Sequence, residues 1–197
     1  MLELLFVILL SYLIGSIPFS FIFAKIFTGI DVRKSGTGNV GATNVLVSTG
    51  KKRIGLFSVL FDMAKGVSAV YIARLFFGAD IYAFTAGLFA IIGHDFSIFL
   101  RFNGGKGIAT TTGAIIALNP FAIWFCLLAF IASALITRYL ILSSVVTLFC
   151  LPFIMWMLGE GLYGIYFGWF SFLLAIVVHR KDIERLFSGK ESKVFGA

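Results

Sequence analysis

The chain has 197 residues, of which 60% are hydrophobic, 17% aromatic and only 13% charged, with a formal net charge of +7. About a quarter of the residues in a typical soluble domain are charged, whereas the apolar residues here lie in long blocks and the mean hydropathy is +1.04. Because roughly 20 helical residues cross the ~30 Å hydrocarbon core of a bilayer, this composition excludes an ordinary soluble protein. It predicts an all-α, polytopic membrane protein.

The apolar blocks predict spans at residues 2–23, 54–77, 81–100, 108–118, 121–137, 139–158 and 162–178. The first block is expected to remain as a span, because it carries Glu3 where a secretory signal is basic and exceeds the usual signal length. Cys126 and Cys150 lie inside apolar blocks without a CxxC pattern or a nearby histidine, so core packing is expected for both.

The dipeptide Asn119–Pro120 is expected to separate two helices, because Asn favours turns and Pro suits a first helical position. One kinked helix would instead leave six spans. With seven spans, 14 of the 16 Lys and Arg residues lie on one side and only Lys65 and Arg74 lie within a span, whereas six spans divide them eight against six. Since cytoplasmic loops carry the excess of positive charge, seven spans are predicted, with the N-terminus outside and the C-terminus cytoplasmic.

Three polar stretches lie on the cytoplasmic side in this topology: SGTGNVGATN (35–44), GHDFSIFLRFNGGKGIATTTG (93–113) and HRKDIERLFSGKE (179–191). The helix predicted at 108–118 spans only about 16 Å, and short helices at membrane depth usually line a polar site. The positive charge also suits the anionic inner leaflet. Nucleic-acid binding is not expected, because no basic domain stands apart from the membrane.

The NGGKG segment predicts a phosphate or carboxylate site. Gly104, Gly105 and Gly107 allow backbone N–H groups to turn toward one point, Lys106 adds a positive charge, and the helix that begins at Ile108 directs its positive end there. Gly107 stands where a Walker A loop has Ser or Thr, so ATP hydrolysis is not expected. The alternative is a glycine-rich turn whose lysine reaches the membrane surface.

The remaining polar residues each allow a functional and a structural interpretation. The first stretch offers hydroxyl and amide donors on a backbone made flexible by glycine, but a linker has the same composition. His94 and His179 either act on a substrate or are satisfied interfacial side chains. Asp62 and Lys65, three residues apart within a predicted span, are expected to form a neutralising ion pair, with a role in a substrate path as the alternative.

The motifs SGTGNVGATNV, DMAKG, GHDFSIFLRFNGGKGIAT and HRKDIERLFSGKE occur in an order and spacing that resembles the acyl-phosphate:glycerol-3-phosphate acyltransferases of bacterial membranes. The resemblance extends from YLIGSIPF to the final GKE. It implies transfer of a fatty acyl group from acyl phosphate to glycerol 3-phosphate, which gives lysophosphatidate and phosphate, without acyl-CoA, acyl carrier protein, cofactor or metal. It also implies one acyltransferase domain over residues 1–197, in the bacterial plasma membrane, with a site that faces the cytoplasm.

The resemblance implies catalytic roles for Thr37, Lys106 and His179 and a structural role for Glu191. Substrate and phosphate binding are implied for a larger set: Asn39, Gly41, Thr43, Asn44, His94, Gly104, Gly105, Gly107 and Asp182. Because a mixed anhydride is already activated, the expected work is positioning and charge stabilisation.

Three positions depart from the family pattern. Thr37 replaces a serine and keeps the hydroxyl, whereas Val47 replaces an arginine and Asp182 an asparagine. Lys51, Lys52 or Arg53 are candidates to replace the missing cation, and Arg180 or Arg185 to pair with Asp182. We therefore expect acyl-phosphate binding to be kept, and glycerol 3-phosphate to bind more weakly or another acceptor to be used.

Two other functions remain open from these motifs. One is a non-catalytic relative that binds acyl phosphate or anionic lipid as a regulator, and the other is a small transporter of phosphorylated solutes. The transporter is disfavoured because the sequence has no internal inverted repeats and its polar stretches share one side. The motifs determine neither the acyl-chain preference nor the oligomeric state.

Overall fold

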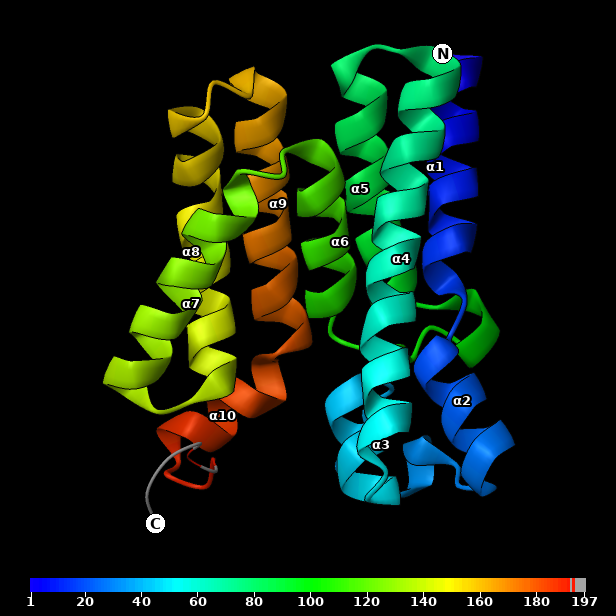
Figure 1. Ribbon diagram of the computed structural model, residues 1–197, viewed down its shortest axis with the longest axis vertical. Helices are drawn as coiled ribbons and strands as arrows, with labels where there is room; N and C mark the ends of the chain where they lie inside the picture. The colour runs from blue at the N-terminus through cyan, green and yellow to red at the C-terminus, as the bar shows by residue number, and fades with distance from the viewer. Residues whose placement is uncertain (192, 194–197) are drawn as a thin grey trace. The chain divides into compact units, whose positions relative to one another are not determined.

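The computed structural model describes residues 1–191 and 193, and all regular structure within this part is helical, as predicted (Figure 1). Five segments are long and apolar enough to cross a membrane: Leu2–Thr28, Lys52–Phe77, Asp80–Leu100, Leu140–Met157 and Gly161–Val178. Two shorter apolar helices, Ile108–Leu118 and Ala122–Thr137, match the remaining predicted blocks.

The chain divides into two compact units, Met1–Leu118 and Asn119–Ala197. The first contains six α-helices among the described residues: α1 (Leu2–Ser16), α2 (Phe19–Thr28), α3 (Ala42–Thr49), α4 (Lys52–Phe77), α5 (Asp80–Asp95) and α6 (Ile108–Leu118). Two short 3-10 turns, Val32–Lys34 and Ile98–Leu100, connect them.

Small residues bring the helices of the first unit into backbone contact. A Cβ on Gly15 of α1 would overlap the backbone of Ala90 in α5, and one on Gly113 of α6 would overlap the backbone of Met63 in α4. Lipid tails are as apolar as the side chains, so helices in a membrane associate mainly through such close packing. This packing places α4 against both α5 and α6.

The first apolar segment is interrupted, where the sequence predicts one helix over residues 2–23. The helix α1 ends at Ser16 and α2 begins at Phe19, with Pro18 between them. Proline has no N–H group and its ring clashes with the preceding turn, so it breaks the helix and leaves carbonyl groups without a partner. The carbonyl of Ile17 accepts from the Phe19 N–H at 3.1 Å and also from Lys65 Nζ at 3.0 Å, and that of Ser16 accepts from Ser97 Oγ at 2.5 Å.

Arg74 of α4 caps the far end of the half-helix α6. Its guanidinium donates to the carbonyl oxygens of Ala117 at 2.6 Å and Leu118 at 2.9 Å. These carbonyls have no partner inside the helix, and a cation there also suits the negative end of the helix dipole. Arg74, a cation within a predicted span, therefore has a structural partner at the end of α6.

The second unit contains α7 (Ala122–Thr137), α8 (Leu140–Met157), α9 (Gly161–Val178) and α10 (Arg180–Phe187) within its described residues, and α8 packs against both α7 and α9. The predicted break at Asn119–Pro120 is present, since α6 ends before it and α7 begins after it. Asn119 Oδ1 accepts from the backbone N–H of Phe121 at 2.8 Å. Cys126 is buried, Cys150 is half-buried, and both are free thiols.

Candidate functional site

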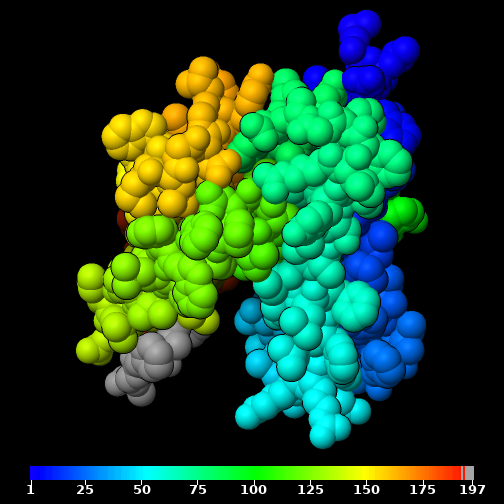
Figure 2. All heavy atoms as spheres, turned by 45° about the horizontal axis from the view of Figure 1, so that its top comes forward, coloured from blue at the N-terminus to red at the C-terminus, as the bar shows by residue number. Residues whose placement is uncertain are grey.

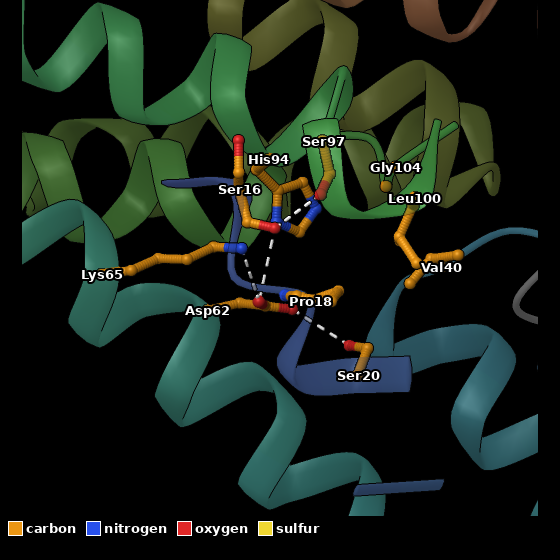
Figure 3. A pocket seen from close by; sticks show the side chains of 11 residues that line it. Ser16, Pro18, Ser20, Val40, Asp62, Lys65, His94, Ser97, Leu100 and Gly104 are labelled. Atoms are coloured by element: carbon orange, nitrogen blue, oxygen red, sulfur yellow. Dashed lines mark hydrogen bonds and ion pairs between the residues drawn. The ribbon is translucent and has the colours of Figure 1, made fainter. Parts of the chain in front are cut away.

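A buried ionic cluster of Asp62 and Lys65 from α4 and His94 from α5 lies in the first unit (Figure 3). Lys65 Nζ is 3.0 Å from Asp62 Oδ1, and each side chain is only 2% exposed, so the predicted ion pair is present. Asp62 Oδ2 accepts from Ser20 Oγ at 3.0 Å, and His94 Nδ1 lies 3.6 Å from Asp62 Oδ1. Breaking one partner of such a pair leaves an uncompensated buried charge, which is strongly destabilising.

The cluster borders a small cavity where several segments of the first unit meet. Figure 3 shows Lys65 and Asp62 reaching from α4 toward Pro18 and Ser20, with His94 of α5 opposite. The other lining residues are Ser16, Val40, Ser97, Leu100, Gly104 and Gly105. The break in the first segment, α4, α5 and both glycine-rich stretches therefore meet at one point.

The segment 103–107, which we call the lysine loop, rests directly on His94 and Asp95. The N–H of Gly105 donates to the His94 carbonyl, and that of Gly104 to the Asp95 carbonyl, both at 3.0 Å. A Cβ on Gly105 would overlap the imidazole of His94. These two N–H groups therefore already have backbone partners and are not directed toward an anion.

Gly107 has a left-handed backbone, with φ of +68°, that favours glycine. A Cβ there would lie 2.8 Å from Asp95 Oδ1. Asp95 is 4% exposed, and its Oδ1 accepts no hydrogen bond from any described residue. A buried carboxyl group therefore lies under the lysine loop, and no motif of the sequence indicates its position.

The segment 35–44, which we call the asparagine loop, is organised by the side chain of Asn44, which is 1% exposed. Its Nδ2 lies at 2.8–3.1 Å from the carbonyl oxygens of Val32, Ser35 and Asn39. Its Oδ1 accepts from the N–H of Thr37 at 2.8 Å and from Ser48 Oγ at 3.2 Å. Both polar atoms of the Asn44 side chain therefore have partners in or next to the loop. This favours a role in holding the loop over direct contact with a substrate phosphate.

The other donors of the asparagine loop face outward. Thr37 and Thr43 are exposed, Asn39 is half-buried, and Gly41 precedes the first turn of α3. Just before the loop, the side-chain hydrogen bond from Arg33 lowers the pKa of Asp31 to about 2. The loop therefore exposes its two threonine side chains, and the carboxylate that precedes it in the chain is already paired with Arg33.

The two loops are neighbours in the first unit. A Cβ on Gly105 would lie 2.8 Å from the carbonyl oxygen of Val40. Val40 also belongs to one buried apolar cluster with Val32, Val45 and Leu100. The first and second polar stretches are therefore brought together, as the topology predicts, although residues 45–92 lie between them in the chain.

The third polar stretch belongs to the second unit and has its own network. His179 is 3% exposed, and its Nδ1 lies 3.0 Å from the Ala175 carbonyl oxygen. Arg185 donates to the buried Asp182 and to Glu191 Oε2, the latter at 2.9 Å. Partial burial opposes the charge of Arg185, but its hydrogen bond to Glu191 and its attraction to Asp182 outweigh this and raise its pKa. Of the two arginines expected to pair with Asp182, Arg185 does so.

Several residues of the cavity were not anticipated from the motifs. Ser16, Ser20 and Ser97 are buried and line the cavity. The break at Pro18 places Ser20 against Asp62 and leaves the Ser16 carbonyl to accept from Ser97. The available signal was the short polar interruption SIPFS inside an apolar block. Among residues 1–191 and 193, no group of three or more His, Cys, Asp or Glu side chains is arranged to hold a metal ion.

Known proteins match this chain over almost its full length. The family described as glycerol-3-phosphate acyltransferase matches residues 5–189. A relative with that name from Rhodopseudomonas palustris (strain HaA2) is 45% identical over 188 residues, which are 95% of this chain and 93% of the relative. A second, from Desulforamulus reducens, is 39% identical over 95% of this chain and 94% of its own.

Two solved structures share the fold. One is described as a crystal structure of PlsY (YgiH), an integral membrane glycerol 3-phosphate acyltransferase, in its glycerol 3-phosphate form. It matches with a TM-score of 0.89 at 34% identity and covers 98% of this chain and 96% of its own. The other, a lysophosphatidic acid form, matches with a TM-score of 0.88 at the same identity. The fold described above is accordingly that of a multi-pass integral membrane protein.

Proposed function

The chain belongs to the glycerol-3-phosphate acyltransferase family, and on this premise we propose that it transfers a fatty acyl group from acyl phosphate to glycerol 3-phosphate. The hydroxyl oxygen of the acceptor attacks the acyl carbonyl carbon, the anhydride C–O bond breaks, and phosphate leaves with the hydroxyl proton or releases it to water. The products are lysophosphatidate and inorganic phosphate. The match over residues 5–189 is the observation that carries this proposal.

The site needs little covalent chemistry, because the anhydride is already activated. Its work is to hold two phosphorylated substrates and to stabilise charge that develops on the carbonyl oxygen and the leaving phosphate. Lys106 and the first turn of the half-helix α6 supply positive charge at one place. We assign Lys106, Thr37 and His179 to the reacting groups, with the half-buried Asn39 and the exposed Thr43 as further phosphate donors.

Other predicted site residues are better understood as supports. Gly104 and Gly105 allow the lysine loop to pack on His94, and Asn44 holds the asparagine loop. Gly41 is the N-cap residue of α3, where a Cβ would lie 3.0 Å from Asn39 Nδ2. Glu191 accepts from Arg185, which also donates to Asp182. Residues of this kind position the groups that touch the substrate.

We further propose seven membrane spans in a bacterial plasma membrane, with the N-terminus outside and the polar loops in the cytoplasm. Five long apolar segments and the two shorter helices α6 and α7 support this count. The concentration of Lys and Arg in the loops supports the orientation. The family match includes both compact units, which supports one acyltransferase domain over the whole chain.

The acceptor site is expected to be altered. Val47 is 61% exposed on α3, and a Cβ on Gly36 would lie 3.3 Å from its Cγ1, so this apolar side chain lies against the asparagine loop. An arginine there would offer a bidentate donor to phosphate, which valine cannot provide. Asp182 adds a carboxylate, although Arg185 pairs with it. We infer weaker binding of glycerol 3-phosphate, or use of another acceptor.

One assay tests the activity. Purified full-length protein in lipid cubic phase is given palmitoyl phosphate with and without glycerol 3-phosphate, while phosphate release and lysophosphatidate are measured. We expect acceptor-dependent release, and a loss of at least about 100-fold in Lys106→Met, typical of removing one charge-stabilising donor.

Two outcomes would overturn the proposal. Binding of palmitoyl phosphate without acceptor-dependent release for any glycerol phosphate or polyol phosphate would indicate a non-catalytic relative. Uptake of glycerol 3-phosphate into sealed proteoliposomes without acyl transfer would indicate a transporter.

A further inference from the structure

A groove lies at the edge of the first unit, between the end of α2 and the start of α4. It is a cavity of about 510 Å³, which we call the basic groove, lined by three consecutive cations and three apolar side chains: Lys51, Lys52, Arg53, Phe27, Ile54 and Phe57. Figure 2 shows the first turns of α4 (cyan) beside α2 (blue) at the lower end of the molecule. None of the lining residues is acidic.

The three cations have no counter-charge of their own. All are exposed, and their side chains form no hydrogen bond or ion pair with another residue of the described chain. The helix α4 begins at Lys52 without a side-chain cap. Its first N–H groups therefore add positive potential to that of the side chains. Neighbouring cations repel one another, and an anion bound between them would offset that repulsion.

An aromatic surface continues from the cations along α2 and α4. Phe27 stacks near Phe23 with ring centroids 6.1 Å apart, and Phe23 meets Phe61 edge-on at 5.0 Å. Phe61 in turn lies 5.1 Å from Phe19. Phe57 is one helical turn before Phe61, and Phe27, Phe57 and Phe61 are 60%, 52% and 42% exposed. We call these five rings, with Ile54, the aromatic track.

The cations and the aromatic track follow one another as the charged head group and the acyl chain of a lipid do. From Arg53 to Phe61 the helix rises about 12 Å, so the apolar surface leads away from the charges along the helix axis. A small soluble phosphate would leave the exposed phenylalanines uncovered. A lipid with an anionic head group would occupy both parts at once, and polybasic segments beside membrane helices commonly attract such lipids.

We propose that the basic groove binds an anionic glycerophospholipid, with its phosphate on Lys51, Lys52 and Arg53 and one acyl chain along the aromatic track. This site is separate from the cavity at the ionic cluster, because the two sets of lining residues have no member in common. The three cations are accordingly occupied by lipid, and are not substitutes for the arginine that is missing at Val47.

Native mass spectrometry of the detergent-purified full chain tests the proposal. Phosphatidylglycerol and phosphatidylcholine with identical dioleoyl chains are titrated separately, and inorganic phosphate is added as a competitor. We expect phosphatidylglycerol to bind at least tenfold more tightly than phosphatidylcholine. The triple variant K51Q/K52Q/R53Q should lose at least tenfold in phosphatidylglycerol affinity and most of this preference. No acyl phosphate or acceptor is present, so the result is independent of the proposed activity.

Two controls separate this site from its alternatives. The variant K34Q/K181Q/K190Q removes the same number of exposed positive charges elsewhere. Its affinity for phosphatidylglycerol should stay within about twofold of wild type. Phe57→Gln should lower the affinity for both lipids by a similar factor, while the preference for the anionic head group remains. This change separates the aromatic track from the cations.

Three results would overturn the proposal. Equal losses in the two triple variants would mean that general surface charge attracts the lipid. Full competition by inorganic phosphate with no effect of Phe57→Gln would indicate a soluble-anion site. Unchanged lipid affinity in K51Q/K52Q/R53Q, with a raised KM for glycerol 3-phosphate, would assign the three cations to the acceptor.

Discussion

The asparagine loop and the lysine loop lie side by side and have similar glycine-rich compositions, but different interactions hold them. In the asparagine loop a single buried side chain, Asn44, contacts three carbonyl oxygens and accepts from the Thr37 N–H. In the lysine loop the backbone itself is bonded to the carbonyls of His94 and Asp95. One loop depends on a side chain and the other on the closeness of two backbones.

Two glycines of each loop, Gly36 and Gly38 in one and Gly104 and Gly105 in the other, differ in the reason for which glycine is required. Gly36 and Gly38 have φ of +59° and +74°, in the left-handed region that other residues rarely adopt. Gly104 and Gly105 have no positive φ, but a Cβ on either would overlap His94, and only Gly107 among the glycines of the lysine loop shares the left-handed backbone. The asparagine loop should therefore be sensitive to loss of a hydrogen-bonding group, and the lysine loop to added volume.

Truncation of the Asn44 side chain should give the largest effect, and it should appear in the free energy of unfolding. Asn44→Ala leaves the Thr37 N–H and the Val32 carbonyl without their partner, and each buried unsatisfied group costs about 1–3 kcal/mol. We expect a loss of about 3 kcal/mol in the free energy of unfolding, measured by denaturant titration in detergent. Ser48→Ala, which removes only one of the bonds to Asn44, should cost about 1 kcal/mol or less. Equal losses would refute the central role of Asn44.

Added volume in the lysine loop should mainly affect catalysis. Gly105→Ala must displace the loop from His94 or from the Val40 carbonyl, and an error of about 1 Å in position can cost about 100-fold in rate. We expect that fall in kcat/KM for phosphate release. The control is Gly55→Ala in α4, whose Cβ would meet Leu46 at an ordinary 3.5 Å. Similar activities of the two variants would show that the loop tolerates the change.

The acceptor hypothesis gives a smaller expected effect, and it applies to the outer face of the asparagine loop. Val47→Arg combined with Asp182→Asn adds a cation beside Gly36 and removes a carboxylate. A gain of one charge-assisted contact corresponds to about tenfold in affinity, so the KM for glycerol 3-phosphate should fall by about tenfold. The KM for acyl phosphate should stay the same. An unchanged acceptor KM would contradict the hypothesis.

The smallest expected effect is at Thr37, whose side chain is exposed and whose hydroxyl receives only a long 3.4 Å contact from the Asn39 N–H. Thr37→Ser keeps the hydroxyl and should change kcat by no more than about twofold, because the loop is held by Asn44 through the backbone N–H and not through the threonine side chain. Thr37→Val removes the hydroxyl at similar volume and should reduce kcat further. If both variants behave like wild type, the hydroxyl has no part in the reaction.

Local patterns in the sequence determined the helical class, the apolar segments, the break at Asn119–Pro120 and the half-helix 108–118. Hydropathy, proline and asparagine act within a few residues, so these features can be predicted without a fold. The Asp62–Lys65 pair was predictable for the same reason, since a three-residue spacing places both side chains on one side of a helix. The resemblance of the motifs to a known family extended this to the activity.

Only the tertiary structure decided what the polar residues contact. Lys65 bonds to Ile17 and Ser97 to Ser16, partners that lie 48 and 81 positions apart in the chain. Gly105 is required because His94 and Val40 approach it, which no property of the NGGKG segment could indicate. Hydrogen bonds and steric contacts are short-ranged in space and depend on how helices pack. Sequence patterns therefore indicated the loops that we propose as the substrate site, while the packing of α1, α4 and α5 determined which residues these loops contact.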